Sequence, residues 1–299
     1  MNAYIKRTIE TAHKSIRIKQ GTSTSRCLFL LLVWVMALPG WAQDDQKEQL
    51  VVPLSSPGKA GSLEVGLVNG SIRIIGYEGK EVLIDAVARV NKQKNKEESS
   101  EEKPASGGMR RISGGNSFQL SAEERNNRVQ VNADSWRRSV DLTIRVPRQF
   151  SLKLSTVNHG NIEVENVSGQ IEVNNVNGDI ELRNVSGSAV ANTVNGKLIA
   201  AFREVSPDAP MAFTTLNGPV DVTFPGSVKM SPRMKSDRGE IYSDFDMALE
   251  KSQPKVDRSS KSGVYRVSIE EGVSGKINGG GPQVLMKNMY GNIYLRKSK

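Results

Sequence analysis

Apolar and polar residues alternate over most of the second half of this chain, and the alternation recurs in units of nine residues. The clearest units span 160–168, 169–177 and 178–186. In each unit the third and fifth residues are apolar, and the residue between them is polar. Because side chains point alternately to opposite faces of a strand, this pattern predicts short β-strands with one buried face.

A glycine opens each unit, at a point where the chain has to turn. Glycine at a corner supplies backbone conformations with positive φ that other residues resist. We interpret the glycines, three isoleucines at the third position and the valines at the eighth position as the structural repeat, and we expect these valines to turn inward. The repeat residues are Gly160, Gly169, Gly178, Gly187, Gly196, Ile162, Ile171, Ile180, Val167, Val176, Val185 and Val194.

The ninth residue alternates between Ser and Asn, which doubles the true period to 18 residues. We therefore expect an all-β fold, a single-stranded β-solenoid (β-helix-like) with about 18–22 residues per turn. Residue i should then lie beside residue i+18, so that Ile162 neighbours Ile180 and Glu165 neighbours Arg183. The alternative is an antiparallel β-meander, because Asn-Gly between two strands is also a strong hairpin signal.

The first 42 residues have the layout of a secretory signal peptide. Six lysines and arginines precede an apolar run at 28–38, and Ala42 provides a small residue for cleavage. The run is too short to span the roughly 30 Å hydrocarbon core of a bilayer as a helix. We expect export to the periplasm or the cell surface, with no integral membrane span after cleavage. The alternative is a membrane anchor formed by uncleaved residues 28–38.

The strand pattern also sets the expected domain organisation. Residues 43–62 should form an N-terminal linker, and residues 63–299 should form one β-solenoid domain. Polar segments at 91–117 and 250–263 interrupt the alternation, and we expect both to be loop insertions. The first of them is rich in charged residues and has no apolar face.

Composition narrows the possible functions. Cys27 is the only cysteine and lies in the signal segment, which excludes disulfides, zinc–thiolate sites and thiol nucleophiles from the mature chain. That mature chain has 35 basic and 31 acidic residues, and the resulting net charge of +4 does not indicate a nucleic-acid partner. The repeat lacks the Gly-Gly-x-Gly-x-Asp motif of calcium-binding nonapeptides, so we expect no metal and no cofactor.

Catalytic candidates are few. His159 is the only histidine after residue 42 and sits at a turn, so no Ser-His-Asp arrangement is predicted. A β-helical enzyme acting on polysaccharides would use carboxylates and basic residues on an outer face. The repeat carries such side chains, although polar residues are expected at these solvent-facing positions in any case: Glu163, Glu165, Asp179, Glu181 and Arg183.

Several longer segments resemble a bacterial family of unknown function that is labelled "putative adhesin". These segments are 140–147, the Val-Asn-Gly and Val-Ser-Gly repeats, 213–225 and 239–245. The resemblance covers residues 140–299 and, more loosely, 60–90. It implies an exported β-helical protein of the cell envelope, and it supplies no catalytic residue.

These features lead to one functional hypothesis and one alternative. The chain is expected to be an exported, non-enzymatic cell-envelope protein that presents a repetitive β surface for adhesion or assembly. Its partner would be an unknown envelope protein or a glycan, and not a nucleic acid. The alternative is a polysaccharide-active β-helical enzyme that uses the outer-face carboxylates.

Overall fold

The computed structural model describes residues 47–89, 119–133, 139–250, 255–261, 264–270 and 272–299. All of these residues belong to one compact unit, Asp44–Lys299. The expected signal segment and the polar segment 91–117 lie outside them. Strands account for all the regular structure of the described ranges, which confirms the all-β class. Within the same ranges there is no helix with the length and apolar character needed to cross a bilayer.

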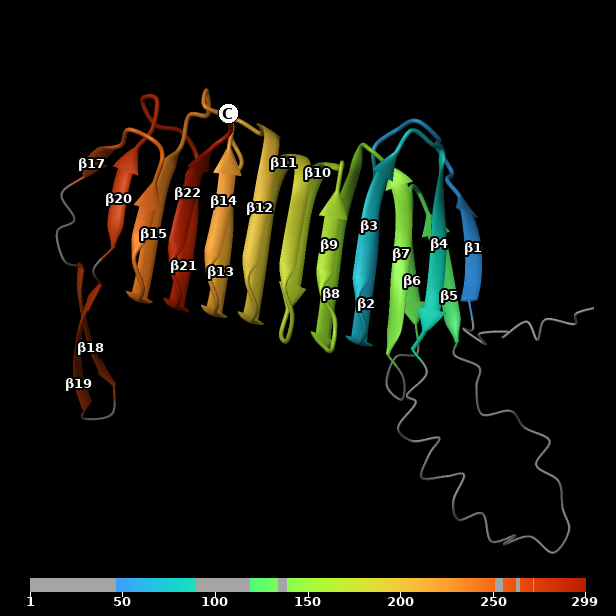
Figure 1. The fold of residues 1–299 in the computed structure, drawn as a ribbon, viewed down its shortest axis with the longest axis horizontal. Coiled ribbons are helices and arrows are strands. Elements are labelled where there is room, and N and C mark those ends of the chain that lie inside the picture. Colours follow the sequence, from blue (N-terminus) through green and yellow to red (C-terminus); the bar gives the residue numbers. More distant parts are fainter. Residues whose placement is uncertain (1–46, 90–118, 134–138, 251–254, 262–263, 271) are drawn as a thin grey trace, which may run out of the picture. The chain divides into compact units, whose positions relative to one another are not determined.

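Twenty strands form one hydrogen-bonded sheet, and this sheet folds into two layers (Figure 1). The long strand β11 (Ile180–Asn195) belongs to both layers, because its first half pairs within one layer and its second half pairs within the other. Layer 1 contains, in spatial order, β5 (Leu120–Arg125), β6 (Arg128–Ala133), β2 (Gly61–Asn69), β8 (Phe150–Asn158), β10 (Ser168–Asn175), the second half of β11, β13 (Met211–Asn217), β21 (Gln283–Tyr290), β15 (Ser231–Arg238), β20 (Val273–Lys276) and β17 (Ala248–Glu250).

Layer 2 contains, in spatial order, β1 (Lys47–Pro53), β4 (Glu81–Ala88), β7 (Val140–Pro147), β3 (Ile72–Tyr77), β9 (Ile162–Glu165), the first half of β11, β12 (Leu198–Val205), β14 (Val220–Phe224), β22 (Ile293–Lys297) and β16 (Ile241–Ser243). A strand of layer 1 and the layer 2 strand that follows it in the chain form one rung of a stack. Strands of successive rungs pair in parallel. Among the described strands of the two layers, antiparallel pairs occur at both ends of layer 1 and at the β1 end of layer 2.

The register within the repeats is the one that the 18-residue period predicts. Ile180 pairs with Ile162 on one side and with Leu198 on the other, and Arg183 pairs with Glu165. The separation grows to 22 residues where Leu198 pairs with Val220. The meander would place 161–165 beside 170–174 in antiparallel pairing, and the observed register contradicts that arrangement within the repeats.

The chain does not pass along the stack in sequence order throughout. The rung β2/β3 lies between β6/β7 and β8/β9, although it precedes both in the sequence. The last rung, β21/β22, lies between β13/β14 and β15/β16. Sequence order and spatial order therefore coincide from β8 to β14.

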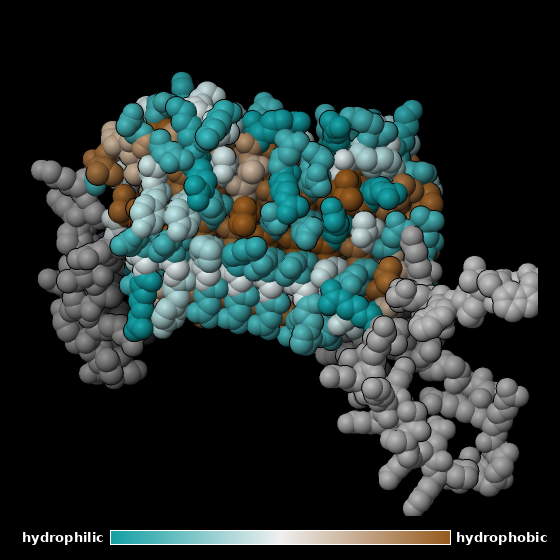
Figure 2. Space-filling model, viewed as in Figure 1, coloured by the Kyte–Doolittle hydropathy of each residue, from teal (hydrophilic) through white to brown (hydrophobic). Residues whose placement is uncertain are grey.

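The core lies between the two layers and is filled by the inward positions of every rung. One column of it contains Ile72, Ile162, Ile180, Leu198, Val220 and Ile293, each with no exposed surface. Burying a side chain of this size contributes roughly 1.5–3 kcal/mol. Where the turn lengthens, Phe202 stacks on Phe224 with ring centroids 5.1 Å apart, and Phe213 meets both edge-on. On the face drawn in Figure 2, hydrophilic residues cover most of the surface and hydrophobic residues show between them.

The prediction that all four eighth-position valines turn inward is right for Val167 and Val185 and wrong for Val176 and Val194. The first two are at most 1% exposed, and the other two are each 37% exposed. An asparagine with φ of 59° or 53° precedes each buried valine, and this left-handed residue breaks the alternation and turns the valine inward. A buried polar residue in extended conformation precedes each exposed valine, so that regular alternation directs the valine outward.

Two expected irregular segments contain strands. Part of the expected linker 43–62 is β1, which pairs with β4 along its whole length. Half of the expected loop 250–263 is β18 (Lys255–Lys261), which pairs with β19 (Val264–Glu270) in a separate antiparallel hairpin. Backbone groups make the hydrogen bonds of a ladder, so a polar segment can form a strand at an edge without an apolar pattern.

Glu124 closes the loop between β1 and β2 against the loop between β5 and β6. Its carboxylate accepts hydrogen bonds from the backbone amide of Ser55 at 3.0 Å, from the Ser55 hydroxyl at 2.8 Å and from the amide of Asn127 at 2.8 Å. These hydrogen bonds, the one from the Ser55 amide most of all, lower the pKa of Glu124 below the usual range of a glutamate.

The first prediction concerns a corner of the stack. A Cβ at Gly178 would lie 2.0 Å from the carbonyl oxygen of Gly160, which is backbone and has no room to move. Gly178→Ala should therefore lower the free energy of unfolding by more than about 2 kcal/mol in urea titrations. Gly66→Ala is the matched control, because only the flexible hydroxyl of Ser155 lies near its added Cβ. Equal losses in both variants would contradict the proposed close approach.

The second prediction concerns pH. The folded pKa of Glu124 lies below its unfolded value, so its contribution to stability is present above the unfolded pKa and is lost as pH falls through the folded pKa. Glu124→Gln should therefore melt at a lower temperature than the wild type at neutral pH, and the gap should close as pH falls toward about 3. A gap that is constant over this pH range would show that the charge of Glu124 is not what stabilises the loops.

Candidate functional site

The corner that leads from layer 1 to layer 2, here called corner A, stacks the backbones of successive rungs at very short distance. A Cβ at Gly160 would lie 1.8 Å from the oxygen of Gly70, and one at Gly196 would lie 2.2 Å from the oxygen of Gly178. Glycine is therefore required at this corner by the close approach of the next backbone. The column of corner A runs through Gly70, Gly160, Gly178, Gly196, Gly218, Gly291 and Gly239.

The nine-residue glycine period thus divides between two corners. Gly160, Gly178 and Gly196 lie at corner A, whereas Gly169 and Gly187 lie at the opposite corner, where a Cβ at Gly187 would lie 2.2 Å from the oxygen of Gly169. The three repeat isoleucines, Ile162, Ile171 and Ile180, are at most 2% exposed. The glycines and isoleucines of the repeat therefore build the scaffold.

A polar side chain from the adjoining rung donates a hydrogen bond to the glycine carbonyl at six of the seven levels of corner A. Sequence reasoning missed this row, although its polar residues end apolar runs that otherwise alternate regularly. The donors and their acceptors are Thr156 to Gly70 at 2.9 Å, Asn175 to Gly160 at 3.0 Å, Thr193 to Gly178 at 2.9 Å, Thr215 to Gly196 at 3.0 Å, Asn288 to Gly218 at 3.1 Å and Ser236 to Gly291 at 3.0 Å.

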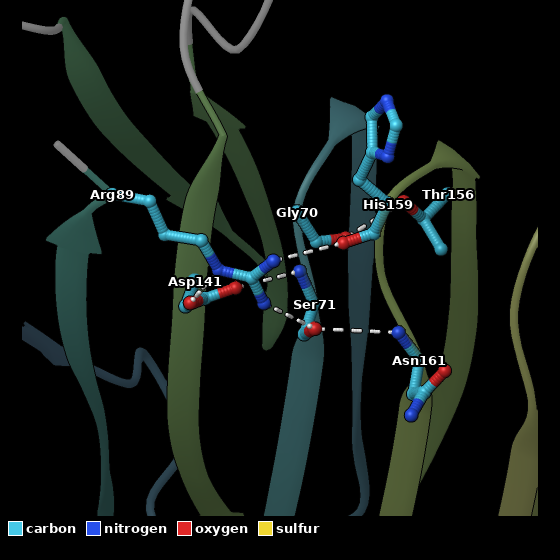
Figure 3. A network of polar contacts seen from close by, with 7 residues as sticks. All are labelled: Gly70, Ser71, Arg89, Asp141, Thr156, His159 and Asn161. Carbon is cyan, nitrogen blue, oxygen red and sulfur yellow. Dashed lines mark hydrogen bonds and ion pairs between the residues drawn. The ribbon is translucent and has the colours of Figure 1, made fainter. Parts of the chain in front are cut away.

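Arg89 ties together three rungs at corner A (Figure 3). Its guanidinium donates to Asp141 Oδ2 at 2.5 Å, to Ser71 Oγ at 3.1 Å and to the carbonyl oxygen of His159 at 3.1 Å. The amide of Asn161 also donates to Ser71 Oγ, at 3.2 Å. Asp141 lies on β7, Ser71 precedes β3 and His159 follows β8, so the contacts span the inserted rung β2/β3 and fasten it on both sides.

His159 contributes its backbone, and not its imidazole, to this network. His159 is an extra residue that the other corners lack, and its φ is 57°. Its exposed ring points away from Ser71 and Asp141 in Figure 3. The extra residue accounts for the separation of 19 between Leu152 and Ile171. The expectation that His159 is a turn residue agrees with this geometry.

The outer carboxylates singled out from the sequence lie on layer 2 or at corner A, and basic side chains accompany them. Arg73 lies 3.8 Å from Glu163 and 3.9 Å from Glu165. Arg183 lies 2.6 Å from Glu181 on its own strand. A general acid for glycoside hydrolysis requires a carboxyl group held in an apolar pocket. These carboxylates stand on an open strand surface, and the corner residue Asp179 pairs with Lys197 at 3.6 Å.

A groove of about 600 Å³ lies elsewhere, on the outer side of layer 1, where it crosses β2, β8, β10 and β11. Its lining includes three serines and the charged residues Glu64, Lys153 and Glu172. Glu64 and Lys153 form an ion pair at 3.6 Å. None of the five carboxylate and arginine candidates lines this groove. Among the described residues, no group of three or more histidine, cysteine, aspartate or glutamate side chains could hold a metal ion.

The third prediction concerns the polar row of corner A. Thr193→Val keeps the shape of the side chain but leaves the carbonyl of Gly178 without its side-chain donor. The free energy of unfolding should fall by about 1–3 kcal/mol in urea titrations. Thr223→Val, on the outer side of β14, is the control and should change it by less than about 0.5 kcal/mol. A Thr193→Val variant as stable as the control would contradict the structural importance of the row.

Comparisons with solved structures include the following two distant resemblances. A "putative cell adhesion protein" from Clostridium sporogenes covers 85% of this chain and 100% of its own length, with 11% identity and a TM-score of 0.43. A "putative adhesin" from Bacteroides fragilis covers 83% of this chain and 96% of its own length, with 12% identity and a TM-score of 0.32. A search of curated protein sequences gives no match.

A family model matches part of the stack, residues 151–278. The matched residues contain most of β8, all of the repeats and the rungs β13/β14 and β15/β16. Residues 151–278 match the family described as Toastrack DUF4097, and the family resemblance expected from the sequence is confirmed.

Proposed function

We propose that this chain is an exported, non-enzymatic cell-envelope protein that presents a repetitive β surface for adhesion or assembly. Its scaffold is a single-stranded β-solenoid whose winding departs from sequence order at two rungs. Export follows from the signal-like leader, and the mature protein begins at Gln43. The two distant structural resemblances, both named for adhesion, agree with the proposal but do not carry it.

The observation that carries the proposal is the alignment of outward side chains into rows. Inward positions and corner A hold the stack together, so outward positions are available for contacts with a partner. Arg73, Glu163 and Glu181 occupy equivalent positions on β3, β9 and β11 and lie side by side in register. Successive members of such a row are about 4.8 Å apart, the spacing of neighbouring strands. A surface of this kind offers a partner side chains at a regular spacing.

The alternative, an enzyme that cleaves polysaccharides, has weaker support. The candidate carboxylates pair with arginine and lysine on open surfaces, where nothing excludes water from a reacting bond. The one observation in its favour is the groove on layer 1, which contains Glu64 and Glu172. A glycan chain laid across the strands would follow that groove, so both glutamates belong in any test for turnover.

The fourth prediction tests the proposed function. The protein should be recovered from the envelope fraction with Gln43 as its first residue, and it should bind envelope components saturably without degrading any glycan in a polysaccharide screen. Glu163→Gln and Glu181→Gln should leave binding intact, with Glu64→Gln and Glu172→Gln as the groove variants. Turnover that disappears in one of these four variants would establish the enzymatic alternative.

A further inference from the structure

One outer region of the stack has no ionisable side chain over five rungs. It consists of three adjacent rows at the end of the layer 1 strands and at corner A, here called the neutral strip. In spatial order the rows are Gly66, Ser155, Asn174, Asn192 and Thr214; Val68, Val157, Val176, Val194 and Leu216; and Asn69, Asn158, Asn177, Asn195 and Asn217. The outer side of layer 2, by contrast, carries rows of glutamates and arginines.

The middle row of the neutral strip is aliphatic and exposed. Val157 is 39% exposed, Val176 and Val194 are each 37% exposed, and Leu216 is 42% exposed. Met289, at 38%, continues the row on the next rung. These five residues make up half of the exposed large hydrophobic side chains in the part of the chain that the structure describes. Exposed apolar groups that gather in one place usually mark a contact surface.

The two flanking rows are fixed by hydrogen bonds between their own side chains. Asn177 Nδ2 donates to Asn158 Oδ1 at 3.2 Å, Asn195 donates to Asn177 at 2.8 Å, and Asn217 donates to Asn195 at 2.6 Å. On the other side Asn192 donates to Asn174 at 3.1 Å, and the hydroxyl of Thr214 donates to Asn192. These amide ladders hold the strip rigid and use much of its hydrogen-bonding capacity.

An exposed aliphatic row between two amide ladders favours another protein surface of the same kind as its binding partner. Ladders of asparagine beside aliphatic rows form dry interfaces between paired β-sheets. Two neutral strips can face each other without like-charge repulsion, and twofold symmetry lets one surface serve both partners. A glycan would be bound better by free polar groups and aromatic rings, whereas the amides of the strip are engaged with one another and its fifteen positions include no aromatic residue.

We propose that the neutral strip is the contact through which two copies of this chain form a twofold dimer. At a strand spacing of about 4.8 Å and a rise of about 3.3 Å per residue, the strip is roughly 20 Å long and 10 Å wide. Two facing strips of this outline cover only about 200 Å² on each copy, below the area of stable specific interfaces, so the association is weak and depends on concentration. Pairing would double the repetitive surfaces presented by each assembly, which raises avidity for a multivalent partner.

The inference goes beyond the proposed function and does not depend on it, because self-association can be measured without any envelope partner. Sedimentation velocity of Asp44–Lys299, the unit that contains the whole described core, should show a reversible monomer–dimer equilibrium. Val176→Lys combined with Val194→Lys should raise the dissociation constant at least about tenfold, because dimerisation would then bury unpaired charges. Val190→Lys is the matched control, since Val190 lies on the same strand as Val194, is 39% exposed and stands outside the strip. It should leave the equilibrium unchanged.

A second measurement keeps the test independent of any effect on folding. The chain has no cysteine after residue 27, so a single introduced cysteine reports on one position only. Val176 lies on the middle rung of the strip, and a twofold axis through this rung brings the residue beside its mate. Val176→Cys should form an intermolecular disulfide under mild oxidation, and Val190→Cys should not. A wild-type chain that stays monomeric at its highest soluble concentration, or a dimer that persists in the double lysine variant, would overturn the proposal. Failure of the envelope-binding test would leave it standing.

Discussion

The close approach of one backbone corner to the next is the constraint on which the rest of this structure depends. At corner A the glycine of each rung lies against the carbonyl of its neighbour, at a distance that no Cβ would permit. The amides of this corner also bond between rungs: Gly178 donates to Asn195 at 2.9 Å, and Gly196 donates to Asn217 at 2.9 Å. Because buried backbone groups have to be paired, the polar row that reaches the glycine carbonyls is as necessary as the glycines themselves.

This constraint explains how rungs that are distant in sequence can stack beside one another. A rung needs a glycine at corner A and a polar side chain a few residues before it, and these requirements do not involve sequence order. Asn288 and Gly291 meet them for the last rung. Asn288 donates to the carbonyl of Gly218 at 3.1 Å and Gly291 packs against the same carbonyl, although 73 residues separate the two glycines. The Arg89 network performs the corresponding task at the other end, where β2/β3 enters the stack.

Local features of the fold can be predicted from the sequence, whereas pairings between strands that are distant in the sequence cannot. The register of Ile162, Ile180 and Leu198 is predictable, because a fixed period places like residues beside one another. The exposure of Val176 is not, because it depends on whether the preceding residue is extended or left-handed. The position of the rung β21/β22 cannot be predicted either, because the sequence around Gly291 would fit beside any rung that has a glycine at corner A. In the candidate site, the outer carboxylates could be predicted from the repeat. The contacts of Arg73 and Arg89 could not, because their partners lie on strands that are distant in the sequence.

Inward positions stabilise the fold and outward positions are available for binding, and this difference connects the fold with the proposed function. Because inward residues and corner A hold the stack together, the outer rows are free to differ from place to place. They are charged over layer 2, they include serines in the groove, and they are neutral along the strip. The most direct test of this account is amide hydrogen exchange at Gly218, which donates to Tyr290 of the out-of-order rung at 2.8 Å. The account predicts that this amide exchanges only through global unfolding, as slowly as those of Gly178 and Gly196. Rapid exchange at Gly218 beside protected amides at the other two glycines would contradict it.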